Sequence, residues 1–421
     1  MFSSLTSNYK IKDVGLASQG QISIYLAESR MPTLMKIRSS FEKHKPLENI
    51  SIGACLHVTR ETAALIRTFS LGGASIALCA SNPLSTQDDV AAALVKDNVS
   101  VYAWHGNDSE YYDCMRRVLD QKPNILIDDG ADLIVLAHKE RQKALPTVIG
   151  AQEETTTGVN RLQIMSCKKL LKIPVIAVNN AKTKMMFDNR YGTGQGIISV
   201  IKALNTLFAG KTAVIAGYGW CSRGMAMRAK GLGANVIVTE IDPIRALEAV
   251  MDGFRVMPMA KAIKEADIVF TATSCKDVLT KHHFIDMKDG TILANLGHFN
   301  VEISVEDLEK LSKKKVKINE YVEEYELPNG KRLYLLGEGR LANLVILGGH
   351  PSEIMDLSFS IQALTAKYLT VNHANLENIV YDVPEEIDKN VAIAKLETMN
   401  IQIDTLNKVQ EAYVKSFEEG T

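Results

Sequence analysis

The sequence predicts an α/β protein with two doubly wound parallel sheets, one in each of two domains, and a C-terminal helical tail. Short runs of β-branched residues alternate with helix-compatible segments from about residue 50 onward, which is typical of parallel sheets covered by helices. These runs fall into two series. The length of 421 residues is enough for two or three domains of ordinary size.

The composition is that of an ordinary globular protein, with 46% apolar and 23% charged residues. The 48 Lys and Arg residues balance 49 Asp and Glu residues, so no global field favours nucleic acid or an anionic membrane surface. We find no apolar block of the signal-peptide kind and no run of about 18 apolar residues. We therefore expect a cytoplasmic protein that binds neither membranes nor nucleic acid.

The six cysteines are widely spaced and form no C-x-x-C pair. In a chain of this length we interpret them as reduced, buried, small hydrophobic residues. The sequence therefore predicts no disulfide framework and no metal site.

The first series contains six expected strands, each followed by at least ten helix-compatible residues. They are SIGACLH (51–57), ASIALCAS (74–81), SVYAWHG (100–106), NILIDDG (124–130), TVIGAQE (147–153) and PVIAVNN (174–180). A long helical stretch around 190–209 precedes the second series. The expected strands there are KTAVIAGYG (211–219), NVIVTEID (235–242), DIVFTAT (267–273), TILANLG (291–297) and RLYLLGEG (332–339).

The boundary between the domains is expected near Thr193, where Y-G-T-G-Q-G interrupts the helical pattern with three glycines. After Gly349 the chain returns to helix, and we expect it to pack on the first unit or on a neighbouring subunit. The expected division is 1–190 for the first part of a substrate domain, 191–348 for a nucleotide domain, 349–385 for a return to the substrate domain, and 386–421 for the tail.

A glycine-rich loop follows the strand KTAVIA and opens a helix. Gly217, Gly219 and Ser222 occupy the three positions of the G-x-G-x-x-G pattern, with serine at the third. This loop brings backbone N–H groups close to a pyrophosphate at the start of a helix. Glu240 ends the next strand, 21 residues after Gly219, where a carboxylate binds a ribose diol and disfavours a 2′-phosphate. The pattern predicts an NAD site; the alternative is a tight turn that binds no nucleotide.

Polar residues follow five strands of the first series, at the sheet edge where ligands of open parallel sheets bind. They are His57, Asn82, Asp129, Glu154 and Asn179. Lys184 and Asp188 stand four residues apart and share one face if this segment is helical. Because Met185, Met186 and Phe187 lie between them, we expect a partly buried turn in which the pKa of Lys184 is depressed, so that it acts as a base. The alternative is an exposed ion pair of little energetic value.

Ten motifs in order make the chain resemble the S-adenosylhomocysteine hydrolase family over nearly its whole length. They are G-A-C-L-H-V-T-R-E-T, S-T-Q-D-D, D-D-G-A-D, E-E-T-T-T-G-V, K-M-M-F-D-N-R-Y-G, G-Y-G, T-E-I-D-P, G-H-F-N-V-E-I, E-G-R-L-A-N-L and G-H-P-S. The resemblance implies reversible hydrolysis of S-adenosylhomocysteine to adenosine and homocysteine, within the methyl cycle of one-carbon metabolism. It also implies tightly held NAD, a hinge that closes over the substrate, and a homotetramer.

The resemblance also implies a role for individual residues. Lys184, oriented by Asp188, handles the proton of the 3′-hydroxyl, and Asp129 abstracts the C4′ hydrogen. His57 and His298 handle protons near C5′, and Glu154 binds the ribose hydroxyls. The implied substrate-binding residues are Thr59, Glu61, Asp129, Glu154, Lys184, Asp188 and His350, with Glu61 toward the adenine edge.

The implied cofactor-binding residues are Thr155, Thr156, Thr157, Asn189, Gly217, Gly219, Trp220, Cys221, Ser222, Arg223, Gly224, Glu240, Arg245, Cys275, Leu296, Gly297, His298, Asn343 and His350. The chain departs from many members in three ways: Thr193 replaces a cysteine, Ser222 replaces a glycine, and a C-terminal extension bearing Lys and Tyr is lacking. Three alternatives stay open, namely preference for S-inosylhomocysteine, an NAD-dependent dehydrogenase with net oxidation, and a catalytically silent NAD-binding module.

Overall fold

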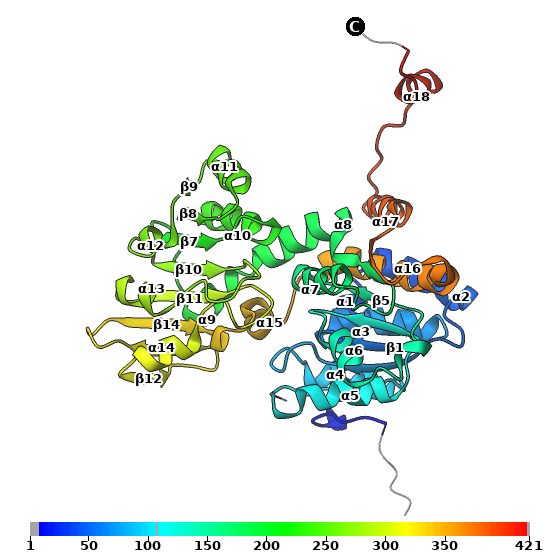
Figure 1. Cartoon of the computed structure of the whole chain (residues 1–421), viewed down its shortest axis with the longest axis horizontal. Helices are drawn as coiled ribbons and strands as arrows, with labels where there is room; N and C mark the ends of the chain where they lie inside the picture. Colours follow the sequence, from blue (N-terminus) through cyan, green and yellow to red (C-terminus); the bar gives the residue numbers. More distant parts are fainter. Residues whose placement is uncertain (1–7, 107, 419–421) are drawn as a thin grey trace, which may run out of the picture.

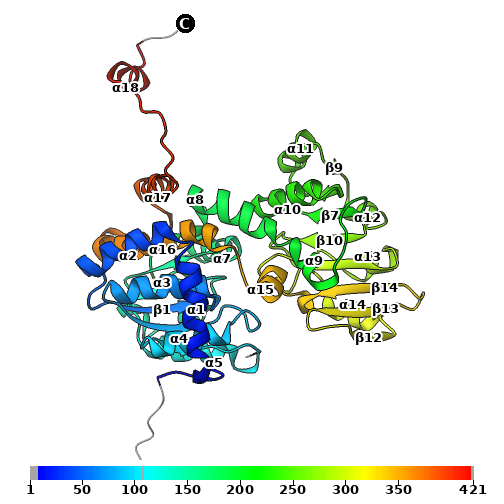
Figure 2. The same ribbon diagram turned by 180° about the vertical axis from the view of Figure 1, so that it is seen from behind.

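The computed structural model describes residues 8–106 and 108–418. The chain forms two sheet-centred halves that lie side by side, the first coloured mainly blue to cyan and the second green to yellow (Figure 1). Seen from behind, helix α15 (Ala342–Leu347) and helix α8 (Lys182–Lys184) lie between the halves (Figure 2). The predicted α/β fold with two sheets is confirmed.

Seven parallel strands form the first sheet, in the order β15-β6-β5-β4-β1-β2-β3. They are β1 (Ser51–Cys55), β2 (Ser75–Cys79), β3 (Ser100–Tyr102), β4 (Ile125–Asp128), β5 (Gly150–Glu153), β6 (Val175–Ala177) and β15 (Val380–Asp382). The first six coincide with the predicted segments. β15 pairs with β6, so a C-terminal segment completes the first sheet.

Helices cover both faces of this sheet because alternate strand residues point to opposite sides. Ile52 and Ile127 pack in one apolar cluster, whereas Cys55 and Leu126 pack in another. The first cluster includes residues of α1 (Ala17–Glu28), α2 (Pro32–His44), α3 (Arg60–Leu71), α4 (Asp88–Lys96) and α16 (Ser352–Asn372). The second includes residues of α5 (Tyr111–Asp120), α6 (Asp132–Glu140) and α7 (Thr156–Cys167).

Eight strands form the second sheet, in the order β12-β13-β14-β11-β10-β7-β8-β9. They are β7 (Thr212–Ala216), β8 (Asn235–Thr239), β9 (Arg255–Val256), β10 (Ile268–Thr271), β11 (Thr291–Asn295), β12 (Lys314–Lys317), β13 (Val322–Glu326) and β14 (Arg332–Leu336). The five predicted strands are present and parallel. The sequence did not predict β9, which has two residues, or β12 and β13, which pair antiparallel at a charged edge.

Helices again cover both faces of the second sheet. One apolar cluster includes residues of α9 (Ile198–Leu204), α10 (Trp220–Gly231) and α15. The other includes residues of α12 (Met259–Ala262), α13 (Lys281–Asp286) and α14 (Val305–Leu311). Helix α11 (Pro243–Met251) packs at the edge, against β8 and β9.

The chain passes from the first half to the second through α8 and a π-helix, η5 (Met185–Thr193). The helical stretch expected around 190–209 is present in part, because a turn at 196–197 divides η5 from α9 and α9 ends at Leu204. Three glycines, at 192, 194 and 196, lie in and just after η5. One of them lets η5 approach α10 closely, since a Cβ at Gly194 would lie 2.7 Å from the backbone carbonyl carbon of Gly224. π-helical turns occur frequently at functional sites.

The tail begins with α17 (Glu385–Thr398), which packs on α16 and α2. Beyond it the chain runs out from the body and ends in α18 (Lys408–Lys415), as both ribbon views show (Figures 1 and 2). Every residue from 401 to 418 is exposed, including Val409, Tyr413 and Phe417.

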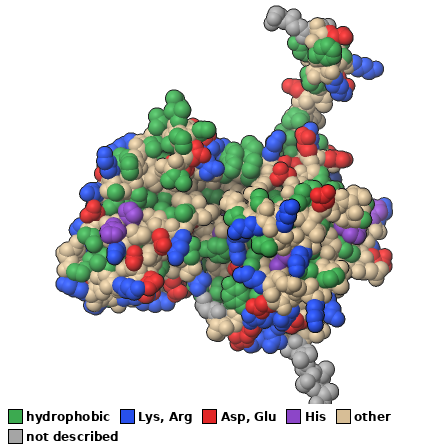
Figure 3. Space-filling model, viewed as in Figure 1, with side chains coloured by type: hydrophobic (Ala, Val, Ile, Leu, Met, Phe, Trp, Pro, Cys, Tyr) green, Lys and Arg blue, Asp and Glu red, His purple; other side chains and the backbone are tan. Residues whose placement is uncertain are grey.

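Positive and negative side chains are interspersed on the face shown in Figure 3, in line with the balanced composition. Within residues 8–106 and 108–418, no helix is long and apolar enough to span a membrane. The expectation that all six cysteines are buried is wrong for three of them: Cys167 and Cys275 are exposed and Cys221 is partly exposed, because they lie outside the apolar strand and helix faces.

Candidate active site

A cavity of about 1120 Å³ lies where the carboxyl ends of the two sheets face each other. Its walls combine residues from both halves and from α16. Most of the predicted site residues line it: His57, Thr59, Glu61, Asp129, Glu154, Thr155, Thr156, Thr157, Lys184, Asp188, Asn189, Gly217, Gly219, Trp220, Cys221, Glu240, Arg245, Cys275, Leu296, Gly297, His298, Asn343 and His350. The fold thus brings together residues more than 290 positions apart in sequence.

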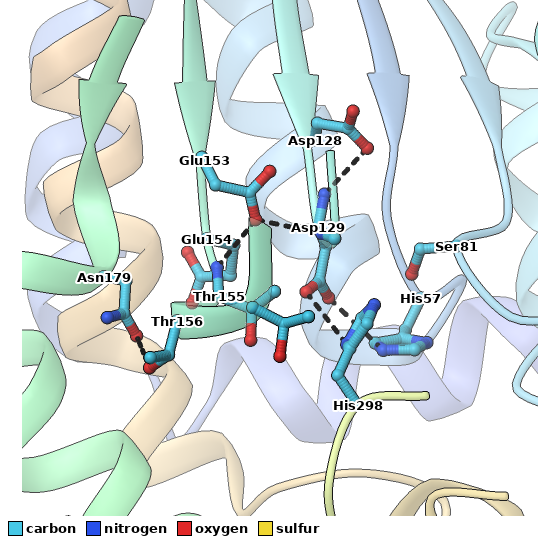
Figure 4. A network of polar contacts seen from close by, with 12 residues as sticks. His57, Ser81, Asp128, Asp129, Glu153, Glu154, Thr155, Thr156, Asn179 and His298 are labelled. Atoms are coloured by element: carbon cyan, nitrogen blue, oxygen red, sulfur yellow. Dashed lines mark hydrogen bonds and ion pairs between the residues drawn. The ribbon is translucent and has the colours of Figure 1, made fainter. Parts of the chain in front are cut away.

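Two histidines from different halves flank Asp129 (Figure 4). His57 Nε2 lies 3.2 Å from Asp129 Oδ2, and His298 Nδ1 lies 3.7 Å from Asp129 Oδ1. The imidazole rings are 6.1 Å apart between centroids. Because Asp129 follows β4 and His298 follows β11, this cluster forms only when the two sheet edges face each other.

His57 lies between Ser85 and Asp129. Its Nδ1 is 2.8 Å from the Ser85 hydroxyl, which also donates to the carbonyl of Asn82 at 2.9 Å, and its Nε2 is 3.2 Å from Asp129 Oδ2. The two neutral tautomers therefore place the ring proton against Ser85 or against the Asp129 carboxylate. Burial lowers the pKa of His57 to about 4, against the opposing effect of Asp129. His57 is thus a neutral base near neutral pH.

A glycine next to Asp129 lets His298 come close. Gly130 has φ of +112°, and a Cβ at this position would lie 2.3 Å from His298 Nε2. Any side chain here would meet the imidazole as well as the unfavourable backbone conformation. The carbonyl of Gly130 also accepts a hydrogen bond from Arg161, which fixes the turn.

A buried cation lies beside this cluster. Lys184 Nζ is 3.0 Å from Asp188 Oδ2 and 3.5 Å from Glu154 Oε1. It also donates hydrogen bonds to Asn189 Oδ1 at 2.9 Å and Asn179 Oδ1 at 3.3 Å. The predicted pairing of Lys184 with Asp188 is confirmed, and both side chains are almost completely buried.

The expected depressed pKa of Lys184 is wrong. Burial alone would lower its pKa, but the charges of Asp188 and Glu154 outweigh burial and raise it. Burial alone would likewise raise the pKa of Asp188, but Lys184 and His350 lower it. For Glu154, burial prevails over Lys184 and raises the pKa. The free site therefore holds a lysine cation and at least one carboxylate.

Helix α16 completes the pocket from the C-terminal part of the chain. Ser358 and Gln362 donate hydrogen bonds to the two carboxylate oxygens of Glu154. Ser352 donates to Glu61 Oε1 at 2.6 Å. These three α16 residues were not predicted, because a polar residue on one face of a helix gives no sequence signal until its partner is known.

Another chain of hydrogen bonds links Asp188 to the second half. His350 Nδ1 donates to Asp188, and His350 Nε2 lies 2.6 Å from Asn343 Nδ2 and 3.5 Å from Thr193 Oγ1. Asn343 is 1% exposed, and its Oδ1 has no hydrogen-bond partner within the described part of the chain. It is an available acceptor at the wall of the cavity, which suits an amide donor such as the nicotinamide carboxamide.

The glycine-rich loop has the form that a dinucleotide requires. Gly217 has φ of +85°, and Gly219 precedes the first residue of α10. Glu240 Oε2 accepts the N–H of Tyr218 at 2.7 Å, so the acidic residue lies at the loop. Arg245 also lies near the loop: a Cβ on Gly219 would be 4.0 Å from its guanidinium. These residues fit NAD.

Three predicted cofactor residues do not line the cavity: Ser222, Arg223 and Gly224. The Ser222 hydroxyl is fully buried and donates to the carbonyl of Ala216 at 3.1 Å, so serine fills the space of the third glycine and ties α10 to β7. Arg223 pairs with Glu248 on α11. A Cβ at Gly224 would lie 1.7 Å from a backbone oxygen of η5, so this glycine allows helix packing.

Two family models match the chain. The model for S-adenosyl-L-homocysteine hydrolase matches residues 8–148, and the model for its NAD-binding domain matches residues 189–349. The chain is 55% identical to an adenosylhomocysteinase of Saccharolobus solfataricus and 54% identical to one of Aquifex aeolicus, covering 98% of this chain and 100% of each relative. It is also 52% identical to an S-inosyl-L-homocysteine hydrolase of Methanothermobacter thermautotrophicus, with the same coverage.

Proposed function

Because the chain belongs to the S-adenosyl-L-homocysteine hydrolase family, we propose that the central cavity hydrolyses S-adenosyl-L-homocysteine reversibly to adenosine and L-homocysteine. NAD is the cofactor. One observation carries the proposal: a dinucleotide loop on one half and two proton-transfer clusters on the other line the same cavity. A hydrolase that oxidises its substrate transiently needs the cofactor site and the proton-transfer groups next to the same bound substrate.

The Lys184 cluster serves the 3′-hydroxyl. When bound, NAD supplies the acceptor for the hydride of the ribose C3′ and returns that hydride at the end of the turnover. Lys184 must give up a proton before it can take one from the hydroxyl. Glu154, 3.5 Å away with a raised pKa, is the better acceptor, whereas Asp188, 3.0 Å away with a lowered pKa, holds the lysine in place. Oriented in this way, Lys184 receives the hydroxyl proton, and Glu154 holds the ribose.

The Asp129 cluster serves C4′ and C5′. A carbonyl at C3′ acidifies the C4′ hydrogen, and Asp129 accepts this proton as homocysteine leaves from C5′. Neutral His57 faces the same point through Nε2, 3.2 Å from Asp129, so the His57–Asp129 pair takes a proton from the water that adds to C5′. His298 closes the cluster from the second half and donates to the leaving sulfur. Closure of the two halves excludes bulk water from the keto intermediate.

The base-binding end lies at the start of α3. Thr59 is the N-cap of this helix and accepts the N–H of Thr62. Glu61 is 2% exposed, and its carboxylate accepts hydrogen bonds from Arg60 and Ser352. A carboxylate acceptor fits the exocyclic amine of adenine. We assign Thr59 and Glu61 to nucleoside binding on this basis, and His350 to the ribose end, because it contacts Asp188.

Thiol release tests the proposed function. The NAD-loaded protein is incubated with S-adenosyl-L-homocysteine and with S-inosyl-L-homocysteine in parallel, and free thiol is measured colorimetrically. We expect faster release from the adenosyl compound. Absence of thiol release from both compounds would refute the proposal, faster release from the inosyl compound would reassign the substrate, and steady accumulation of NADH at 340 nm would indicate a dehydrogenase.

We further propose the division into 1–190, 191–348, 349–385 and 386–421, a cytoplasmic location, and a homotetramer. Exposed apolar side chains on the tail and just before α11 support the assembly: Ile241 is 98% exposed and Phe417 is 96% exposed. Burying such residues against neighbouring copies is favourable. Sedimentation analysis of the NAD-loaded protein tests the tetramer.

A further inference from the structure

A buried carboxyl group that none of the steps above uses lies beside the Asp129 cluster (Figure 4). Glu153 is the last residue of β5 and is 0% exposed. Its Oε1 accepts the N–H of Gly130 at 2.9 Å and the N–H of Thr155 at 2.9 Å. One oxygen atom therefore joins the loops that follow β4 and β5.

Those two loops carry the groups that act on the ribose. Gly130 follows Asp129, which we assign to C4′, and Thr155 follows Glu154, which we assign to the ribose hydroxyls. The two strands that end here are neighbours in register, with Asp128 opposite Glu153. The bridge thus fixes the distance between two carboxylates that must contact the same sugar.

The surroundings are shaped around this carboxyl group. A Cβ on Gly158 would lie 2.2 Å from Glu153 Cδ, so the glycine makes room for it. The second oxygen, Oε2, is buried and has no partner in the described ranges 8–106 and 108–418. Burial first, and then Asp128 and Asp129, raises the pKa of Glu153 well above its ordinary range. A neutral carboxyl with a carbonyl-type Oε1 can still accept both N–H groups.

We propose that Glu153 is a positioning residue, whose side chain holds the turns of Asp129 and Glu154 at the spacing that C4′ proton abstraction requires. The inference rests on the proposed function. Without the bridge, two backbone N–H groups beside the cavity lose their acceptor, and both turns are free to shift. Small displacements of reacting groups have large effects on rate.

Two substitutions separate the effect of the hydrogen-bond bridge from the effects of side-chain volume and charge. Glu153→Gln keeps an acceptor oxygen of the same reach, whereas Glu153→Met keeps the volume and removes the acceptor. Asp356→Leu is the control for loss of a buried carboxyl outside the cavity, because Asp356 is also 0% exposed and accepts two backbone N–H groups, of Thr33 and Leu34; it pairs with Lys395 at 2.8 Å as well. All are compared as NAD-loaded enzymes with adenosine as the probe.

Exchange of the adenosine C4′ hydrogen with D₂O, followed by proton NMR, reports on Asp129, while NADH absorbance at 340 nm reports on 3′-oxidation. We expect Glu153→Met to slow exchange by about 100-fold and oxidation far less. Glu153→Gln should keep both within about threefold, and Asp356→Leu should lower only the melting temperature.

Exchange in Glu153→Met within about threefold of wild type would overturn the positioning role. Equal slowing in Asp356→Leu, or slowing in Glu153→Gln as large as in Glu153→Met, would also overturn it. A wild-type enzyme that shows neither exchange nor NADH formation would instead refute the proposed function itself.

Discussion

Replacement of Lys184 by methionine removes the only lysine or arginine side chain within 3.5 Å of the buried Asp188 and Glu154 carboxylates in the described structure, and leaves His350 as the remaining partner of Asp188. At an effective dielectric constant of about 20, each of these ion pairs is worth about 5 kcal/mol before desolvation is subtracted. Removing one partner from a buried pair leaves an uncompensated charge and typically lowers the free energy of unfolding by about 3–5 kcal/mol. We expect a loss of this size in Lys184→Met.

A triple variant separates the structural effect from the chemical one. In Lys184→Met, Glu154→Gln, Asp188→Asn no buried charge is left unpaired, so most of the lost stability should return. Activity should not return, since the group that takes the 3′-hydroxyl proton is absent and such groups contribute about 10²- to 10⁴-fold. Thermal unfolding measures the first effect, and NADH formation from added adenosine measures the second.

Either of two results would contradict this reasoning. The first is a single variant, Lys184→Met, that unfolds at the wild-type temperature, which would mean that the carboxylates do not depend on the lysine. The second is NADH formation at the wild-type rate in the triple variant, which would remove Lys184 from the 3′-oxidation step.

Gly130→Ala should lower kcat/KM at least 100-fold with little change in NAD affinity, because its Cβ would lie 2.3 Å from His298 Nε2 at a φ of +112°. A near-normal kcat/KM would contradict the close approach of His298 to Gly130. Burial lowers the pKa of His57 from 6.5 to about 4, so between these values the unfolded chain binds more protons and stability falls as pH falls. The melting temperature of the wild type should therefore drop more steeply from pH 6.5 to 4 than that of His57→Asn. Parallel curves for the two proteins would contradict the lowered pKa of His57. Ser222→Gly should lower unfolding stability by about 1 kcal/mol through loss of its bond to Ala216, while NAD affinity by calorimetry stays within about threefold; a larger change in affinity would give Ser222 a direct role.

Local sequence patterns were sufficient for most of the fold. Eleven strands were predicted from β-branched runs bounded by turn residues, and all eleven are present, because a strand buried on both faces must be apolar. The strands that were missed lack this signal. Lys314–Lys317 is a charged edge strand, and Arg255–Val256 is too short to have a pattern.

The candidate site was predicted in part. His57, Asp129 and Glu154 follow strands that end at one sheet edge, and that rule is enough to place them together. The pairing of Lys184 with Asp188 and a basic role for Lys184 were predicted from local pattern, whereas the proton-transfer role of His298 came from family resemblance. Ser222, Arg223 and Gly224 belong to the same loop-and-helix motif, but the helix directs them away from the cavity.

The sequence by itself determined the fold class, the cofactor and the chemistry, because each depends on short motifs whose residues lie close together along the chain. Only the tertiary structure decided the charge of Lys184 and the role of Glu153. A pKa is set by the balance between burial and nearby charges in space, and the pKa of Lys184 is raised by the two carboxylates beside it. The function of Glu153 depends on two backbone N–H groups from different loops, which only the pairing of β4 with β5 brings to one oxygen atom.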